Sequence, residues 1–226
     1  MRNVRIILNK KDRLKFVSHL DMNRFMSRIL RLSGIPIWYT EGFNPHPYLT
    51  FALPLSLGFE SDYEILDIRV IDDEFTNSQV KSALNSVLPE YMQVLEVFDA
   101  VLKPGKIAFA EFCVLINNVS ANERILNFVS KNEILVEKTG KKGKVSLIDL
   151  KPHIKKFEIT NNEDKLVVNL ILPAGGSCNI NPSLIFDNIE GLGYYTITRK
   201  MVYDEQMHPF KWFIEMRAFL CYNVLN

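Results

Sequence analysis

The first 34 residues place a strand directly before a helix whose start and stop are both marked, and this pair constrains the fold most. Arg2–Leu8 alternates apolar and polar residues, as a half-buried strand does. Ser18 and Asp21 have the spacing of a capping box, and apolar residues then recur at intervals of three and four. Gly34 supplies the stop. The pattern predicts a chain that alternates strands and helices.

The rest of the first half extends this order. Turn residues and a second helix cap separate the apolar segments that follow. The expected elements are a strand at Ile37–Thr40, a strand at Glu64–Ile71, a helix capped by Thr76 or Asn77 that reaches Leu88, and a strand at Gln93–Phe98. The order β-α-β-β-α-β is that of a ferredoxin-like unit.

The second half repeats the same order of elements after a Pro-Gly turn at residues 103–106. The expected elements are strands at Ile107–Ile116, Ile134–Lys138, Lys165–Leu172 and Tyr194–Tyr203, with helices at Ala121–Ser130 and Pro182–Ile189. We therefore predict an α+β fold of two tandem ferredoxin-like domains, residues 1–103 and 104–205, with antiparallel sheets and helices on one face. Residues 138–164 form a lysine-rich insertion with a short helix near Leu147–Ile154, and residues 206–226 form an aromatic-rich helical tail.

Composition narrows the class of protein. The 27 basic and 26 acidic residues give a net charge of +1, so any preference for nucleic acid must come from local patches. No apolar run approaches the length that spans a bilayer, and the amino terminus does not resemble a signal peptide, which predicts a cytoplasmic protein without a membrane partner. Cys113, Cys178 and Cys221 are widely spaced. They predict neither a disulfide framework nor a metal or iron–sulfur cofactor.

Topology predicts that two histidine-containing segments meet. In a ferredoxin-like unit, the start of the first helix and the loop between the second and third strands lie at one edge of the sheet. Ser18, His19 and Asp21 belong to the helix start. Gly42, Asn44, Pro45, His46 and Pro47 belong to the segment that we expect to face it.

Each histidine has a functional and a purely structural interpretation. His19 lies in the first helical turn, where a neutral imidazole could accept a proton, contact a phosphate or bind a metal. Alternatively, Ser18 and Asp21 only cap the helix and His19 is an exposed surface residue. Pro45 and Pro47 stiffen the backbone around His46, which suits a recognition loop or an ordinary rigid turn.

Basic residues gather in two places. Lys10, Lys11, Arg13 and Lys15 precede the first helix, and Lys138, Lys141, Lys142 and Lys144 lie in the insertion. Such groups predict contacts with a phosphate backbone, and binding would then weaken steeply with salt. The alternative is a solvated loop without a ligand.

Three motifs, at Phe16–Asp21, Gly42–Pro47 and Phe51–Gly58, resemble the radical-SAM-linked family of uncharacterised bacterial proteins. Ser61, Glu64 and Asp67 follow in the same pattern, and the resemblance runs loosely to about Arg199. Members of that family are found beside, or fused to, a radical-SAM enzyme with a cobalamin-binding region. This chain has no Cys-x-x-x-Cys-x-x-Cys motif, so the resemblance implies a companion of that enzyme. It also implies that the functional edge is Ser18, His19, Asp21, Gly42, Asn44, Pro45, His46 and Pro47.

The favoured function is a non-catalytic accessory module that binds RNA, or an RNA-associated substrate, for a radical-SAM partner. A first alternative is a metal-independent endoribonuclease, since the predicted tandem halves also resemble the CRISPR-associated repeat-RNA endonucleases. In that scheme His19 is the base, and Lys15 or His46 is a supporting cation. A second alternative is a structural homodimer assembled through the tail at residues 206–226.

Overall fold

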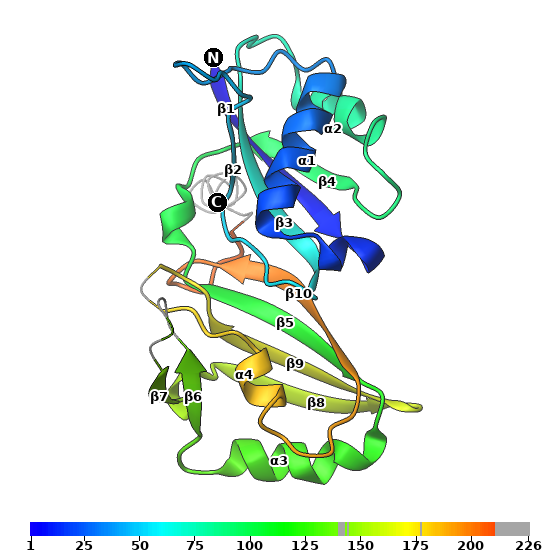
Figure 1. Ribbon diagram of the computed structural model, residues 1–226, viewed down its shortest axis with the longest axis vertical. Coiled ribbons are helices and arrows are strands. Elements are labelled where there is room, and N and C mark those ends of the chain that lie inside the picture. Colours follow the sequence, from blue (N-terminus) through cyan, green and yellow to red (C-terminus); the bar gives the residue numbers. More distant parts are fainter. Residues whose placement is uncertain (140–142, 144, 177, 211–226) are drawn as a thin grey trace, which may run out of the picture. The chain divides into compact units, whose positions relative to one another are not determined.

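The computed structural model of this chain describes residues 1–139, 143, 145–176 and 178–210. It is a mixed α+β protein whose sheets are mostly antiparallel and whose helices are few (Figure 1). The chain divides into two compact units. Unit 1 is Met1–Lys106 with the described residues from His208 on, and unit 2 is Ile107–Met207.

Unit 1 contains a sheet in the order β4-β1-β3-β2, and all neighbouring strands are antiparallel. The helices α1 and α2 lie together beside this sheet (Figure 1). Along the chain the elements are β1 (Arg2–Lys10), a 3-10 turn η1 (Asp12–Phe16), α1 (His19–Leu32), β2 (Leu49–Phe51), β3 (Glu60–Val70), α2 (Asn77–Asn85), β4 (Val94–Asp99) and a second turn η2 (Pro104–Lys106).

The core of unit 1 follows from the two periodicities in the sequence. Val4, Ile6 and Leu8 alternate along β1 and pack in one buried cluster with side chains of both helices. Met22 and Met26 bring the apolar stripe of α1 into that cluster. Because each such side chain contributes about 1.5–3 kcal/mol on full burial, this cluster holds the helices to the sheet.

The predicted helix signals are confirmed in unit 1. The Ser18 hydroxyl accepts a hydrogen bond from the Asp21 amide at 3.2 Å and donates one to the Asp21 carboxylate at 2.7 Å. Thr76 and Gln79 form a complete capping box at the start of α2. Gly34 has a φ of 71° just after α1, a backbone conformation that favours glycine.

The prediction of a strand at Ile37–Thr40 is wrong. Ile37 and Tyr39 make only isolated bridges, to Val70 and Pro47, and the second strand is β2, which begins at Leu49. Pro36 and Pro47 cannot donate to a ladder, so regular pairing is interrupted on both sides of this segment. The second strand of unit 1 is therefore Leu49–Phe51, whereas the sequence predicted Ile37–Thr40.

Unit 2 contains a sheet in the order β10-β5-β9-β8, again with antiparallel neighbours. Every second residue of β5 is buried, from Ala110 to Ile116. The elements are β5 (Phe109–Ile116), a 3-10 turn η3 (Val119–Ala121), α3 (Asn122–Ser130), β6 (Leu135–Thr139), β7 (Val145–Asp149), a 3-10 turn η5 (Lys151–His153), β8 (Lys156–Asn162), β9 (Lys165–Pro173), α4 (Ser183–Phe186) and β10 (Tyr195–Tyr203).

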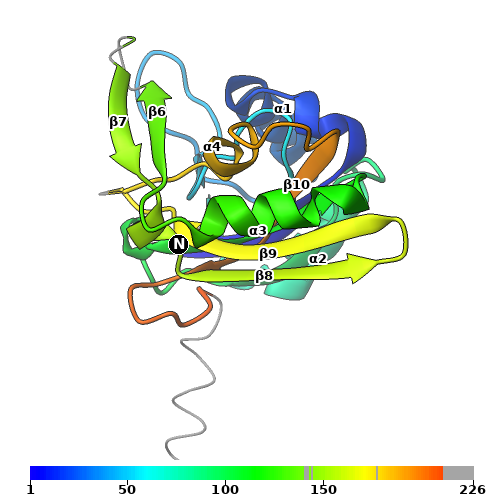
Figure 2. The same ribbon diagram turned by 90° about the horizontal axis from the view of Figure 1, so that it is seen from below.

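Two expectations for the insertion are corrected. The strand expected at Ile134–Lys138 does form, as β6, but it pairs with β7 in a separate hairpin. The strand that pairs with β9 is instead β8, which lies inside the predicted insertion. The expected helix near Leu147–Ile154 is limited to the turn η5. Figure 2 shows the hairpin β6–β7 projecting away from β8 and β9.

Within the described residues, no helix combines the length and apolar character needed to cross a membrane.

Candidate functional site

The His46 segment is a tight loop between Thr40 and Pro47. The Thr40 amide donates to the His46 carbonyl at 2.9 Å, and the His46 amide donates to the Thr40 hydroxyl at 3.2 Å. His46 Nδ1 lies 3.1 Å from the Asn44 carbonyl oxygen and 3.1 Å from the Thr40 hydroxyl. The imidazole is exposed.

Three stacked side chains form the base of this loop. The Arg69 guanidinium lies 4.6 Å from the centre of the Trp38 ring and 4.5 Å from that of Tyr48. The two rings pack edge to face at 5.7 Å, and Arg69 Nε donates to the Asn3 side chain. A cation held between two aromatic rings fixes both rings at the end of β3.

Above this base the loop exposes aromatic side chains. Phe43 is fully exposed and Tyr39 is 42% exposed. Gly42 has a φ of 123°, which favours glycine at the bend next to Phe43. We name residues 38–48 together with Arg69 the aromatic loop. A fully exposed phenylalanine on a braced loop offers a free ring face to a ligand.

The helix start forms a second feature. His19 packs edge to face against Phe51, with ring centres 5.8 Å apart. The Asn23 amide lies 3.0 Å from His19 Nε2 and donates to the His19 carbonyl at 2.9 Å. Ser18 and Asp21 bond to each other, and Asp21 also forms an ion pair with Arg24. Capping and local pairing therefore engage all three residues of the predicted motif.

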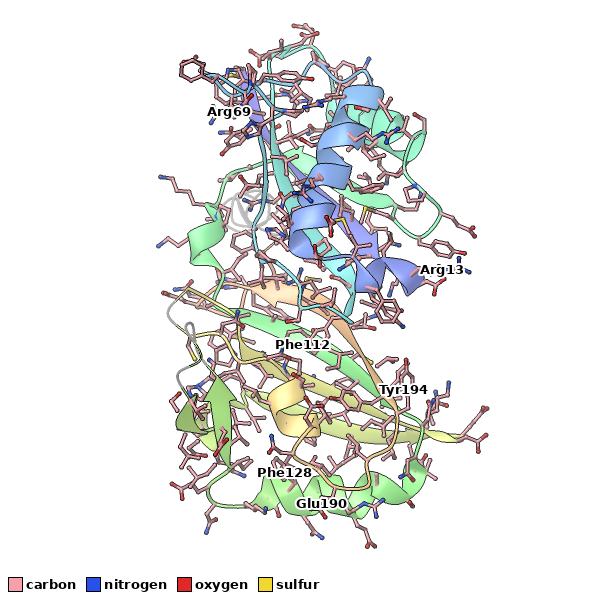
Figure 3. All side chains as sticks on the ribbon, viewed as in Figure 1. Arg13, Arg69, Phe112, Phe128, Glu190 and Tyr194 are labelled. Atoms are coloured by element: carbon pink, nitrogen blue, oxygen red, sulfur yellow. The ribbon has the colours of Figure 1, made fainter. Side chains whose placement is uncertain are left out.

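The two histidine segments do not meet, so the predicted shared edge is wrong. The helix start is instead bonded to the chain after β2, because the Gly58 amide donates to the Lys15 carbonyl at 2.8 Å. Figure 3 shows Arg13, just before α1, and Arg69, in the aromatic loop, at opposite ends of unit 1. The start of the first helix and the loop between the second and third strands do lie at one edge, as the topology predicts. That loop, however, is residues 52–59 and not the His46 segment. We name residues 10–21 and 51–58 the helix-start edge.

The cations of the helix-start edge are largely neutralised. Lys10 is only 4% exposed and donates to the Val17 carbonyl, so it cannot contact RNA as predicted. Lys11 pairs with Asp62, and Lys15 lies 3.6 Å from Glu60. Arg13 is exposed. An exposed basic patch of four residues is therefore not present at this edge.

The lysine-rich insertion is described only in part. Lys138 Nζ donates to the Asn179 carbonyl at 2.8 Å. Lys141, Lys142 and Lys144 lie outside the described residues, as does the tail from residue 211 on. Their predicted contacts with phosphate, and the predicted dimer through the tail, stay predictions.

Sequence reasoning missed two features of unit 1. Phe16, Leu20 and Leu57 are large apolar side chains that are exposed on the helix-start edge. A buried ion pair joins Arg5 to Asp67 on neighbouring strands at 2.7 Å. The sequence does carry a signal for the pair, because Arg5 lies between Val4 and Ile6, and Asp67 lies between Leu66 and Ile68.

The described residues contain no group of three or more histidine, cysteine, aspartate or glutamate side chains arranged to hold a metal ion. His19, for which metal binding was one interpretation, contacts Phe51 and Asn23, whereas His46 is bonded to Thr40.

Fold and site together define an α+β protein with two antiparallel-sheet units, the first of which carries an exposed aromatic loop at one end. A family model described as an uncharacterized protein conserved in bacteria (DUF2344) matches residues 3–182. The chain belongs to this family.

No curated protein matches the chain. Among solved structures, a chain of "Crystal Structure of a Cbf5-Nop10-Gar1 Complex" is similar, with 11% identity and a TM-score of 0.47. The match covers 88% of this chain, which spans about half (48%) of the other. A likeness at this level carries no argument about function.

Proposed function

We propose that the chain is a non-catalytic accessory module that holds single-stranded RNA on its aromatic loop for a radical-SAM enzyme. The observation that carries the proposal is the fully exposed Phe43 in a loop that also contains the stack of Trp38, Arg69 and Tyr48. Single-stranded nucleic acids bind proteins by stacking bases on such rings, with about 1–3 kcal/mol per base. The radical-SAM partner is inferred from the family resemblance of the three motifs.

The proposal includes the predicted tandem architecture. The strand orders β4-β1-β3-β2 and β10-β5-β9-β8 have the same sequence of antiparallel neighbours, which supports two ferredoxin-like halves. In the second half, the hairpin β6–β7 is then an insertion between α3 and β8. Sheets of this kind are frequent supports for RNA-stacking aromatic residues.

The charges around the aromatic loop shape the expected affinity. Arg69 is already held between two rings, and Glu41 adds a negative charge to the exposed part of the loop. RNA would therefore release few counterions on binding. We expect binding that depends on stacking and weakens only slightly with salt, in contrast to the steep dependence that the lysine groups predicted.

Phe43→Ala is expected to weaken binding of a fluorescent oligouridylate about tenfold, because one stacked base contributes about 1–3 kcal/mol. Fluorescence anisotropy at several salt concentrations measures the change. Phe16→Ala is the matched control, since Phe16 is an exposed phenylalanine at the opposite end of unit 1 and should leave the affinity unchanged. Equal affinities of the wild type and Phe43→Ala would reject the aromatic loop as the RNA site.

The helix-start edge supports a second part of the function, the docking of the enzyme. Phe16 and Leu57 lie next to residues joined by the Lys15–Gly58 hydrogen bond, and Leu20 is exposed in the first turn of α1. Exposed apolar side chains beside paired charges are typical of protein interfaces rather than of phosphate-binding surfaces.

Leu57→Asp is expected to abolish co-purification with a radical-SAM enzyme encoded beside this chain, since a buried aspartate would be left unpaired in the interface. Leu147→Asp, on the exposed face of the hairpin β6–β7, is the control and should co-purify normally. Co-expression followed by affinity purification measures both. Undiminished recovery of the enzyme with Leu57→Asp would exclude this edge.

The endoribonuclease alternative is not favoured by the geometry. It places His46 or Lys15 beside His19 as a supporting cation, whereas His46 lies in the aromatic loop and Lys15 faces Glu60. His19 itself is engaged by Asn23 and Phe51.

A further inference from the structure

A cysteine and a histidine of unit 2 are brought together by two turns that are remote in sequence. The Cys178 sulfur lies 3.9 Å from His153 Nδ1, within hydrogen-bonding range for sulfur. Cys178 is a free cysteine, and both side chains are half-buried, so the pair is held by the protein yet open to small molecules. The proposed function uses neither residue.

Backbone contacts are present near both residues of the pair. Ala174 and Asn179 form a bridge that closes the short turn carrying Cys178, and the Ile180 amide donates to the Pro173 carbonyl at 2.9 Å. His153 ends the turn η5, where its amide donates to the Leu150 carbonyl at 3.0 Å. The approach of sulfur to imidazole is thus set by two anchored turns.

Charged groups surround the pair. The Asp149 carboxylate accepts from the amides of Ile134 and Lys151, at 2.8 and 3.0 Å. These two hydrogen bonds are the main reason that the pKa of Asp149 lies below its usual value. Lys138 Nζ is bonded to the carbonyl of Asn179, the residue after Cys178.

We propose that Cys178 is a reactive thiol, with His153 as its base, that undergoes disulfide exchange with an anionic low-molecular-weight disulfide such as oxidised glutathione. A thiol paired with an imidazole has the arrangement of an activated nucleophile. Lys138 supplies the positive charge that favours an anionic reagent.

The exchange is balanced in atoms and electrons. His153 takes the proton of Cys178, and the thiolate attacks one sulfur of the disulfide, so a Cys178–S–S–R bond forms while the reagent's S–S bond breaks. The second half of the reagent leaves as a thiolate, takes the proton from His153, and departs as a free thiol. No further oxidant is required, since the reagent's disulfide is reduced as the mixed disulfide forms.

The test uses the full chain in two single-thiol forms. In the first, Cys113→Ser and Cys221→Ser leave Cys178. In the second, Cys178→Ser and Cys221→Ser leave Cys113, a half-buried residue of β5. Oxidised glutathione is added, and intact mass spectrometry follows the mixed disulfide. We expect Cys178 to react at least about tenfold faster than Cys113. Cys178 should also react faster in the folded chain than in the same chain unfolded in urea, because unfolding removes the contact with His153.

Two variations assign the roles of the neighbours. His153→Gln, whose amide can bond but cannot take the proton, should slow the reaction of Cys178 about tenfold while leaving Cys113 unchanged. Cystamine, a cationic disulfide, should react more slowly than oxidised glutathione, and Lys138→Met should remove this difference. The proposal would be overturned if Cys178 reacted no faster in the folded chain than in urea. It would also be overturned if Cys178 reacted as fast in His153→Gln as in the wild type.

Discussion

Arg5→Met is expected to lower the free energy of unfolding by about 3–5 kcal/mol, because it leaves the Asp67 carboxylate unpaired in the sheet. The Arg5 side chain is 1% exposed, and its Nε and Nη2 each donate to one Asp67 oxygen at 2.7 Å. Nη2 also donates to the Leu102 carbonyl at 2.7 Å, and the guanidinium lies 4.8 Å from the centre of the Phe210 ring. Urea denaturation followed by circular dichroism measures the loss.

Two further variants separate the buried pair from an ordinary ion pair. Arg24→Met breaks the Arg24–Asp21 pair, whose side chains are 70% and 58% exposed, and should cost less than about 1 kcal/mol. Arg5→Met with Asp67→Leu removes both charges and should recover part of the stability lost by Arg5→Met alone. If Arg5→Met cost no more than Arg24→Met, the assignment of Arg5 as a structural cation would be wrong.

Gly175→Ala is expected to destabilise unit 2 by about 1–3 kcal/mol, because the new methyl group has no room. A Cβ at Gly175 would lie 2.6 Å from the Ile107 carbonyl oxygen and 3.3 Å from the Ala108 Cα. Both are backbone atoms, so relief requires movement of the chain at the start of β5. Thermal denaturation measures the change as a lowered melting temperature.

Gly176→Ala is the neighbouring control. A Cβ at Gly176 meets nothing within 4 Å, so we expect a change within about 0.5 kcal/mol of the wild type. Equal melting temperatures for the two alanine variants would show that the turn before Cys178 adapts to the added carbon.

Local signals in the sequence predicted the helices of unit 1 well. Ser18, Gly34 and Thr76 each mark a helix end through hydrogen bonds or dihedral angles within a few residues, and the structure has α1 and α2 at those places. The alternation along β1 and β5 likewise depends only on which face of a strand is buried. Such features need no knowledge of distant contacts.

Strand partners were harder to predict, because a short apolar segment does not specify its neighbour. Ile37–Thr40 and Leu49–Phe51 are both apolar enough for β2, and the choice decides which loop faces the helix start. The same ambiguity assigned Ile134–Lys138 to the position that β8 occupies. The misassigned strand in unit 1 is the reason that His19 and His46 were expected to meet.

Charge neutralisation was also hidden from the sequence. The sequence predicted a basic patch that includes Lys11, Arg13 and Lys15. In the structure, Asp62 pairs with Lys11 and Glu60 lies near Lys15, and both acidic residues come from β3, some fifty residues later. The aromatic loop, in contrast, gains its form from Arg69, whose role required the pairing of the loop with the end of β3.

The proposed contact between RNA and the aromatic loop can be mapped directly with a photo-crosslink. An oligonucleotide carrying 4-thiouridine is bound, irradiated and digested, and the crosslinked peptide is identified by mass spectrometry. RNA bound to the aromatic loop should crosslink to Tyr39 or Phe43, and these crosslinks should be strongly reduced by Phe43→Ala and unchanged by Phe16→Ala. Crosslinks confined to residues 10–16 or 138–156 would contradict it.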